Sequence, residues 1–70
     1  MFYRLVAYHN TKIERDSLEL DRSLSNLENR AKNTKVEDFP NHSLHIEDNF
    51  GKTLCVFYKA SSGLFEEKVN

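Results

Sequence analysis

The sequence contains few of the residues that stabilise small domains through covalent or metal bonds. Cys55 is the only cysteine among seventy residues, which excludes an internal disulfide and leaves no cysteine-rich metal site to expect. A chain without disulfides is typical of a reducing compartment, so we expect a cytoplasmic protein. No residue pattern indicates a cofactor. A domain of this size without disulfide or metal bonds gains stability from association with another molecule.

Long hydrophobic runs are also absent. No apolar stretch approaches the roughly 18 residues that a membrane-spanning helix requires, so we expect no membrane partner. Residues 1–7 are too short, and alternate too regularly between apolar and polar side chains, to form a signal peptide. These absences favour an intracellular protein.

Neither sign of charge is in surplus. Ten Lys and Arg face eleven Asp and Glu, for a formal net charge of −1. Nucleic-acid-binding proteins usually carry a basic surplus, because most of their affinity comes from neutralising phosphates. The overall charge therefore disfavours nucleic acid as the main partner, although a local basic patch is compatible with it.

The hydrophobic pattern predicts one α+β domain spanning residues 1–70. Residues 2–9 alternate and are rich in aromatic and β-branched side chains, which predicts a strand. Apolar residues then recur at helical spacing, and an acidic residue three positions after a capping residue marks the start. We therefore expect a helix over residues 17–33. Its apolar stripe consists of Leu20, Leu24, Leu27 and Ala31.

Two further alternating runs predict a hairpin over residues 43–59. Leu44 and Ile46 are expected to face the core, and Gly51 supplies the positive φ that the intervening turn requires. Residues 64–70 are either a short edge strand or a loose tail. The predicted architecture is β-α-β-β, with a fourth strand if the tail pairs: one helix on one face of a mainly antiparallel sheet. If the first and third strands pair, the third is central.

The run Thr53–Lys59 is apolar on both faces. Leu54, Val56 and Tyr58 alternate with Cys55 and Phe57, whereas a surface strand should present one polar face. A single helix can cover only one side of a sheet. We therefore expect the other side either to bind a partner or to be covered by loop residues such as Phe50.

Three combinations that resemble chemical sites have simpler interpretations. Gly51-Lys52-Thr53 resembles the end of a phosphate-binding loop, but a strand follows where that motif requires a helix. His42 and His45 are separated by an odd number of strand positions, so they face opposite ways and cannot share a metal. Cys55 shares a face with Phe57, an apolar setting that raises a thiol pKa and disfavours nucleophilic chemistry. We expect no enzyme.

In size, intracellular character and one-helix sheet, the whole chain resembles small phage-encoded accessory proteins that inhibit host machinery, anti-CRISPR proteins among them. That resemblance implies a non-enzymatic inhibitor that binds a larger protein. The surplus apolar face leads to the same expectation, a protein-binding module that acts as a homodimer or docked on a partner. Contact candidates are Phe57, Cys55, Phe2 and Tyr8 on the sheet, and Leu18 as an apolar outlier on the helix.

Two alternatives remain open. The pattern does not decide which strand face meets the helix, so Tyr3 and Leu5 can exchange roles with Phe2 and Val6. The alternative function is binding of single-stranded RNA or DNA, because aromatic residues on a sheet can stack bases. The residues for that surface are Phe57, Tyr3, Tyr8, Arg4, Lys52 and Lys59.

Overall fold

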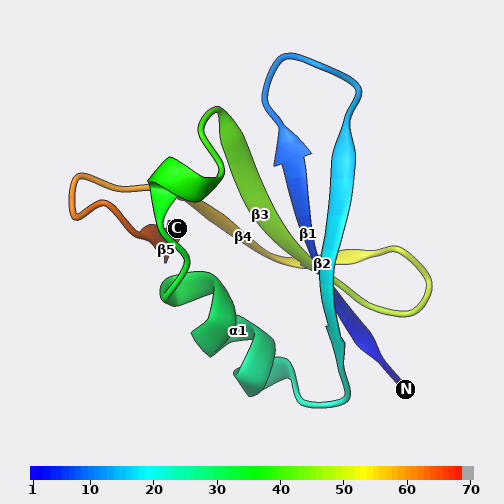
Figure 1. Ribbon diagram of the computed structural model, residues 1–70. Helices are drawn as coiled ribbons and strands as arrows, with labels where there is room; N and C mark the ends of the chain where they lie inside the picture. Colours follow the sequence, from blue (N-terminus) through cyan, green and yellow to red (C-terminus); the bar gives the residue numbers. More distant parts are fainter. Residues whose placement is uncertain (69–70) are drawn as a thin grey trace.

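The protein folds into a five-stranded sheet and one α-helix (Figure 1). The structure is a computed structural model and describes residues 1–68. Val69, which falls in the predicted tail, lies outside the described residues. The elements in chain order are β1 (Tyr3–His9), β2 (Arg15–Asp21), α1 (Leu24–Lys32), the short 3₁₀ helix η1 (Val36–Asp38), β3 (His42–Glu47), β4 (Thr53–Lys59) and β5 (Phe65–Glu67).

The sheet order is β2-β1-β3-β4-β5, and every neighbouring pair is antiparallel. The predicted α+β class, with one helix on one face of an antiparallel sheet, is confirmed, although the sheet has five strands instead of three or four. The strand β1 pairs with β3 and not with β4. The condition for Thr53–Lys59 to be central is therefore not met, and the middle strand is the first strand of the hairpin.

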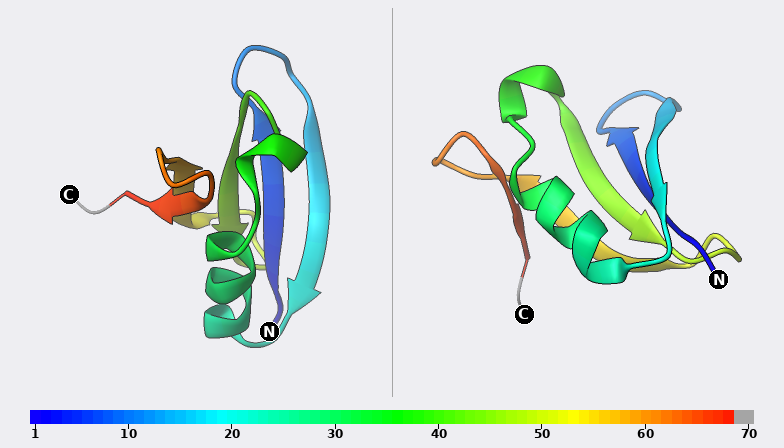
Figure 2. Two further views of the ribbon diagram at one scale, coloured as in Figure 1. Left: turned by 60° about the vertical axis from the view of Figure 1, so that its left-hand side comes forward. Right: turned by 60° about the horizontal axis from the view of Figure 1, so that its bottom comes forward.

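The sheet curls around its helix. α1 contacts β2 at one edge of the sheet and β5 at the other, as well as β1 and β3 between them. A short helix can touch both edges only if the strands bend toward it, and β4 and β5 swing round the helix in Figure 2. We call the face that α1 covers the inner face and the opposite side the outer face.

The core lies between α1 and the inner face. Its fully buried members come from the helix and from every strand except β2, and the pairing Ala7–Leu44–Phe57 shows one continuous row across three strands. Partly buried side chains, Phe39 among them, pack against its margin. The buried cluster consists of Leu5, Ala7, Leu27, Ala31, Leu44, Ile46, Phe57 and Phe65.

The predicted helix began too early. Residues Arg15–Asp21 form the edge strand β2, and α1 starts at Leu24. The segment Ser17-Leu18-Glu19-Leu20-Asp21 alternates apolar and polar residues, so it also fits the period of a strand. Pairing with β1 decides in favour of the strand, because tertiary contacts override weak local preferences.

The true helix start is capped by a different set of residues. The Ser23 hydroxyl accepts a hydrogen bond from the Asn26 amide at 3.3 Å, as an N-cap does. Asp21 accepts from the Ser23 amide at 2.7 Å and from the Asn26 side chain at 3.3 Å. These bonds hold the pKa of Asp21 below its ordinary value, the Ser23 amide contributing most. Asn26 stands where a capping box has Glu or Gln, so that signature did not find this start.

The hairpin was predicted correctly. β3 and β4 pair antiparallel, and Gly51 in the intervening turn has φ of 82°. Phe65–Glu67 form the edge strand β5, so the described part of the C-terminal segment is a strand and not a loose tail. Among residues 1–68, no helix is long and apolar enough to cross a membrane.

Candidate functional site: the outer face of the sheet

Within residues 1–68, no helix covers the outer face. The side chains on this face follow from the strand registers. One cross-strand row contains Val6, His45 and Val56. A second row, nearer the start of β1, contains Leu20, Arg4 and Glu47. The first row spans β1, β3 and β4, and the second spans β2, β1 and β3. The rows allow residues on the β1 side of the face to be compared with residues on the β4 side.

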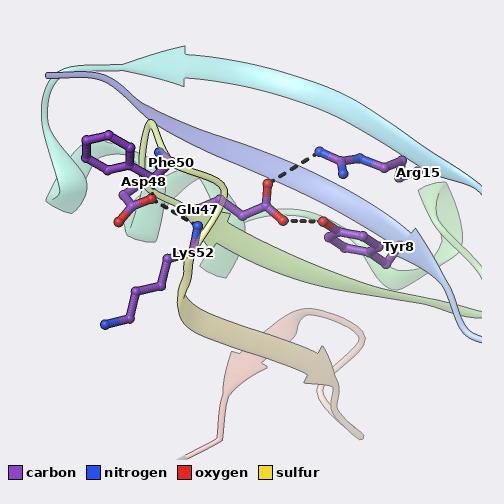
Figure 3. Close-up of polar contacts among 6 residues, drawn as sticks. All are labelled: Tyr8, Arg15, Glu47, Asp48, Phe50 and Lys52. Atoms are coloured by element: carbon purple, nitrogen blue, oxygen red, sulfur yellow. Dashed lines mark hydrogen bonds and ion pairs between the residues drawn. The ribbon is translucent and has the colours of Figure 1, made fainter.

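Over β1 and β3 the face is covered by side chains that lie flat. The Tyr8 hydroxyl donates a hydrogen bond to the Glu47 carboxylate, although Tyr8 pairs with Ser43, four residues earlier on β3 (Figure 3). Four strand residues span about 13 Å, so both side chains must extend along the sheet to meet. The Tyr8 ring lies 4.4 Å from the His45 ring between them.

Arg15 completes this cover from β2. Its guanidinium carbon lies 5.4 Å from the centre of the Tyr8 ring, and its Nη2 lies 3.4 Å from Glu47 Oε1. The Glu47 side chain is only 3% exposed, so a buried carboxylate has a cation and a hydroxyl as partners. The hydrogen bond to Glu47, followed by burial, raises the pKa of Tyr8, which keeps the hydroxyl in its donor form.

Val6 lies among these groups and is fully buried. We name the set of Tyr8, Arg15, His45 and Glu47 around Val6 the closed half of the outer face. Burial lowers the pKa of His45, and the Glu47 carboxylate opposes that shift. These polar side chains thus lie along the sheet and cover β1 and β3, as a second helix would.

The β4 side of the same face is not covered. Leu54 is 41% exposed and Tyr58 is 47% exposed, and Val56 between them is partly buried. Leu54 is an extra residue in the ladder, since Glu47 pairs with Thr53 and the next pair is Ile46 with Cys55. A bulge of this kind re-aims a side chain. We name Leu54, Val56 and Tyr58 the open half.

Further apolar side chains are exposed near the start of β1 and in the β3–β4 turn. Phe2 is 47% exposed, Leu20 is 56% exposed, and Phe50 at the tip of the β3–β4 turn is 83% exposed. Phe2, Leu20 and the turn residues on either side of Phe50 line one hollow together with Arg4. The guanidinium of Arg22 lies 5.0 Å from the centre of the Phe2 ring. We name Phe2, Leu20 and Phe50 the end patch.

The predicted contact residues divide between the faces. Phe57 is fully buried under α1 and Cys55 packs beside it on the inner face, so placing these two on the uncovered side was wrong. Leu18 lies on β2 and not on a helix, and a bulge opposite Leu5 and Val6 turns it toward the core. Tyr8 belongs to the closed half, and only Phe2 is prominently exposed.

Sequence reasoning missed Leu20 as a surface residue because it appeared to belong to a helical stripe. The alternation of Leu54, Val56 and Tyr58 was the available signal for the open half. That signal identified two apolar faces but not which of them the helix covers.

The thiol of Cys55 is not activated. Burial first, and then the carboxylates of Glu67 and Glu28, raise its pKa, so the neutral thiol dominates. This direction agrees with the prediction from its apolar neighbours. No histidine stands as its partner across the strand, where Ile46 lies instead.

The histidines are arranged for structure. His42 and His45 face opposite sides, as predicted, and His9 lies across the strand from His42, with rings 4.9 Å apart. His9 Nδ1 accepts hydrogen bonds from the amides of Thr11 and Lys12, each at 3.1 Å. A metal at Nε2 would require a proton on Nδ1, where these two donors point. Within residues 1–68 no group of three potential metal ligands is present.

No family model, curated protein or solved structure matches this chain.

Proposed function

We propose that the protein is a non-enzymatic binding module that docks on another protein through the open half and the end patch. The observation that carries the proposal is the contrast across one face: the chain covers Val6 completely but leaves Leu54 and Tyr58 each more than two-fifths exposed. Clusters of exposed apolar side chains on one face of a small domain indicate an interaction site. A Tyr and two Phe residues within it are typical binding anchors.

The composition of this surface favours a protein over a nucleic acid. It includes two exposed aliphatic side chains, Leu20 and Leu54, which offer bases no stacking platform. One observation favours nucleic acid: Lys68 lies 5.9 Å from the centre of the Tyr58 ring, a cation beside a half-exposed aromatic. The overall charge of −1 still supplies no phosphate-binding surplus.

We propose a different protein rather than a second copy as the partner, and the solution mass measured below tests this choice. Both signs of charge stand at this surface: Arg4 and Asp48 line the hollow at the end patch, and Lys68 and Glu67 line the hollow at the open half. A standard interface takes about 800 Å² from each partner, about one sixth of the 4820 Å² of this chain. The partner must therefore cover both the open half and the end patch.

Such docking inhibits the partner when it covers a surface that the partner needs for its own activity. The resemblance to phage-encoded inhibitors leads to this role, and a compact module needs no catalytic group to perform it. We place that activity in the cytoplasm, where the single Cys55 stays reduced.

The test compares two variants that each add negative charge. Leu54→Asp with Tyr58→Asp removes the apolar centre of the open half, whereas Asn29→Asp adds charge to the exposed side of α1. All three chains are used to capture proteins from extract of the native host, and solution mass is measured for each. We expect a monomer that captures one protein, loss of that protein with the double variant, and retention with Asn29→Asp.

Three outcomes contradict the proposal. Equal capture by the double variant removes the open half from the interface. A wild-type dimer that becomes monomeric in the double variant assigns the surface to a second copy. Binding of a labelled single-stranded RNA that falls steeply with added salt assigns it to nucleic acid.

A further inference from the structure

The hollow beside Arg4 has a distinct chemistry within this surface. Phe2, Leu20 and the turn residues Asp48, Asn49 and Gly51 line it with Arg4, and its volume is about 110 Å³. A water molecule occupies about 30 Å³ of liquid, so the hollow holds a few waters or one small side chain.

Arg4, the cation that lines this hollow, forms no ion pair among residues 1–68. Glu47 lies directly opposite Arg4 on β3, but its carboxylate already bonds Arg15 and Tyr8 in the closed half. The two ion pairs among the described residues are Arg15 with Glu47 and Arg30 with Glu19. Arg4 is exposed and takes part in neither.

The nearest other carboxylate is also engaged. Asp48 Oδ1 accepts hydrogen bonds from the amides of Phe50 at 2.8 Å and of Lys52 at 3.0 Å, which close the β3–β4 turn (Figure 3). Arg22 adds a second guanidinium at this end, held over Phe2. The Arg4 guanidinium therefore lines the hollow beside Phe2 and Leu20, and the one carboxylate in the lining, Asp48, is held by the amides of the turn.

We infer that this hollow receives an acidic side chain of the partner, an Asp or Glu flanked by apolar residues. The carboxylate pairs with the Arg4 guanidinium, and the flanking apolar side chains lie on Leu20 and Phe2. Arg is suited to this task because its planar fork matches a carboxylate. This inference rests on the proposed function and specifies the partner: a protein whose docking surface carries a carboxylate in an apolar setting.

The probe is a pair of capped peptides, acetyl-Ala-Leu-Glu-Leu-Ala-amide and the same peptide with Gln in place of Glu. Each is titrated into the isotope-labelled full chain, and backbone amide shifts are followed by NMR. We expect the Glu peptide to move the amides of Arg4, Leu20 and Gly51, with an affinity about 5-fold higher than that of the Gln peptide, as for an exposed ion pair.

Two matched variants separate the hollow from general attraction. Arg4→Gln and Lys12→Gln each remove one positive charge, but Lys12 lies in the β1–β2 loop, at the opposite end of β1. Arg4→Gln should abolish the preference for Glu, and Lys12→Gln should leave it unchanged. Because both side chains are exposed, neither change should unfold the domain.

The inference is overturned if both peptides shift these amides equally, if neither shifts them, or if the Glu preference survives Arg4→Gln. Inorganic phosphate serves as a third probe. If phosphate matches the Glu peptide, the hollow responds to any anion and not to a carboxylate in an apolar setting. The peptide titration can fail while the Leu54 and Tyr58 double variant still loses the captured protein. That combination rejects only the acidic contact and leaves the proposed docking function intact.

Discussion

The closed and open halves of the outer face lie on the same sheet and differ in what covers them. His45 separates Val6 from Val56 in one cross-strand row, yet Val6 is fully buried and Val56 is not. On the closed side, Tyr8 and Glu47 extend toward each other along the strands. On the open side, the bulge at Leu54 turns an apolar residue outward instead.

The comparison teaches how a small domain hides a second sheet face without a second helix. Long side chains bury their apolar stems and rings against the sheet while their polar ends pair with one another. The cover requires Glu47 to be desolvated, and that is favourable only because Tyr8 and Arg15 both reach it. Such a cover extends only as far as its members reach, which leaves β4 without one.

The largest difference in stability is expected between substitutions on the two faces of β4. Phe57→Asp removes a fully buried ring and places a carboxylate in the core, which costs roughly 5 kcal/mol or more. A domain of this size has a total stability of about 4 to 10 kcal/mol, so this variant should unfold. Leu54→Asp changes an exposed side chain of the same strand and should keep the fold. Circular dichroism with urea titration measures both.

The sequence pattern alone made Phe57 a contact candidate, whereas its full burial makes it a core residue. A folded Phe57→Asp variant would show that the inner face is not the core. Unfolding by Leu54→Asp would show that the open half contributes to stability rather than to binding.

The local elements were predictable from sequence and the long-range ones were not. The hairpin of β3 and β4 depends on nearby residues, chiefly the turn that ends at Gly51, so its signal lies within the segment. The segment from Ser17 to Asp21 fits a strand and a helix equally well. Its pairing with β1 decides between the two structures, and the local sequence pattern does not reveal that pairing.

The candidate site shows the same limit. The sequence identified two apolar faces on Thr53–Lys59, but assigning them required knowing that α1 packs on the side of Phe57. The closed half depends on a hydrogen bond between Tyr8 and Glu47, thirty-nine residues apart. The bulges at Leu18 and Leu54 reverse the simple alternation that the pattern assumes.

The next largest difference in stability is expected between substitutions of Val6 and Val56, which lie in one cross-strand row. Val6→Thr keeps the side-chain shape but buries a hydroxyl, which costs about 2 kcal/mol where no partner is available. Val56→Thr makes the same change where water has access and should cost about 0.5 kcal/mol or less. Urea titration of both variants gives the difference. Equal losses would show that the two halves are equally covered.

A smaller difference in stability is expected between substitutions of Tyr8 and Tyr58. Tyr8→Phe removes the donor to Glu47 and leaves that buried carboxylate with Arg15 alone, at a cost of about 1.5 kcal/mol. Tyr58→Phe removes a hydroxyl from a half-exposed ring and should change stability by about 0.5 kcal/mol or less. Denaturant midpoints measure both. If Tyr8→Phe is as neutral as Tyr58→Phe, the closed half is not held together by its polar ends.

The smallest effect is expected from pH, because the closed half contains His45, a partly buried histidine whose Nδ1 is buried. Burial holds the pKa of His45 below its ordinary value of 6.5, so the unfolded chain takes up the proton first as the pH falls. His45 therefore contributes stability that is present above about pH 6.5 and is lost as the pH falls toward its lower folded value.

His45 Nδ1 is buried without a hydrogen-bond partner among the described residues, so the fold has no acceptor ready for the added proton. To isolate the contribution of His45, the informative quantity is the free energy of unfolding of the wild type minus that of His45→Gln, measured from pH 8 to pH 5. We expect this difference to decrease below about pH 6.5, by less than the loss caused by Tyr8→Phe. A difference that stays constant with pH would mean that water reaches the His45 ring, and that the closed half is a looser cover than the full burial of Val6 indicates.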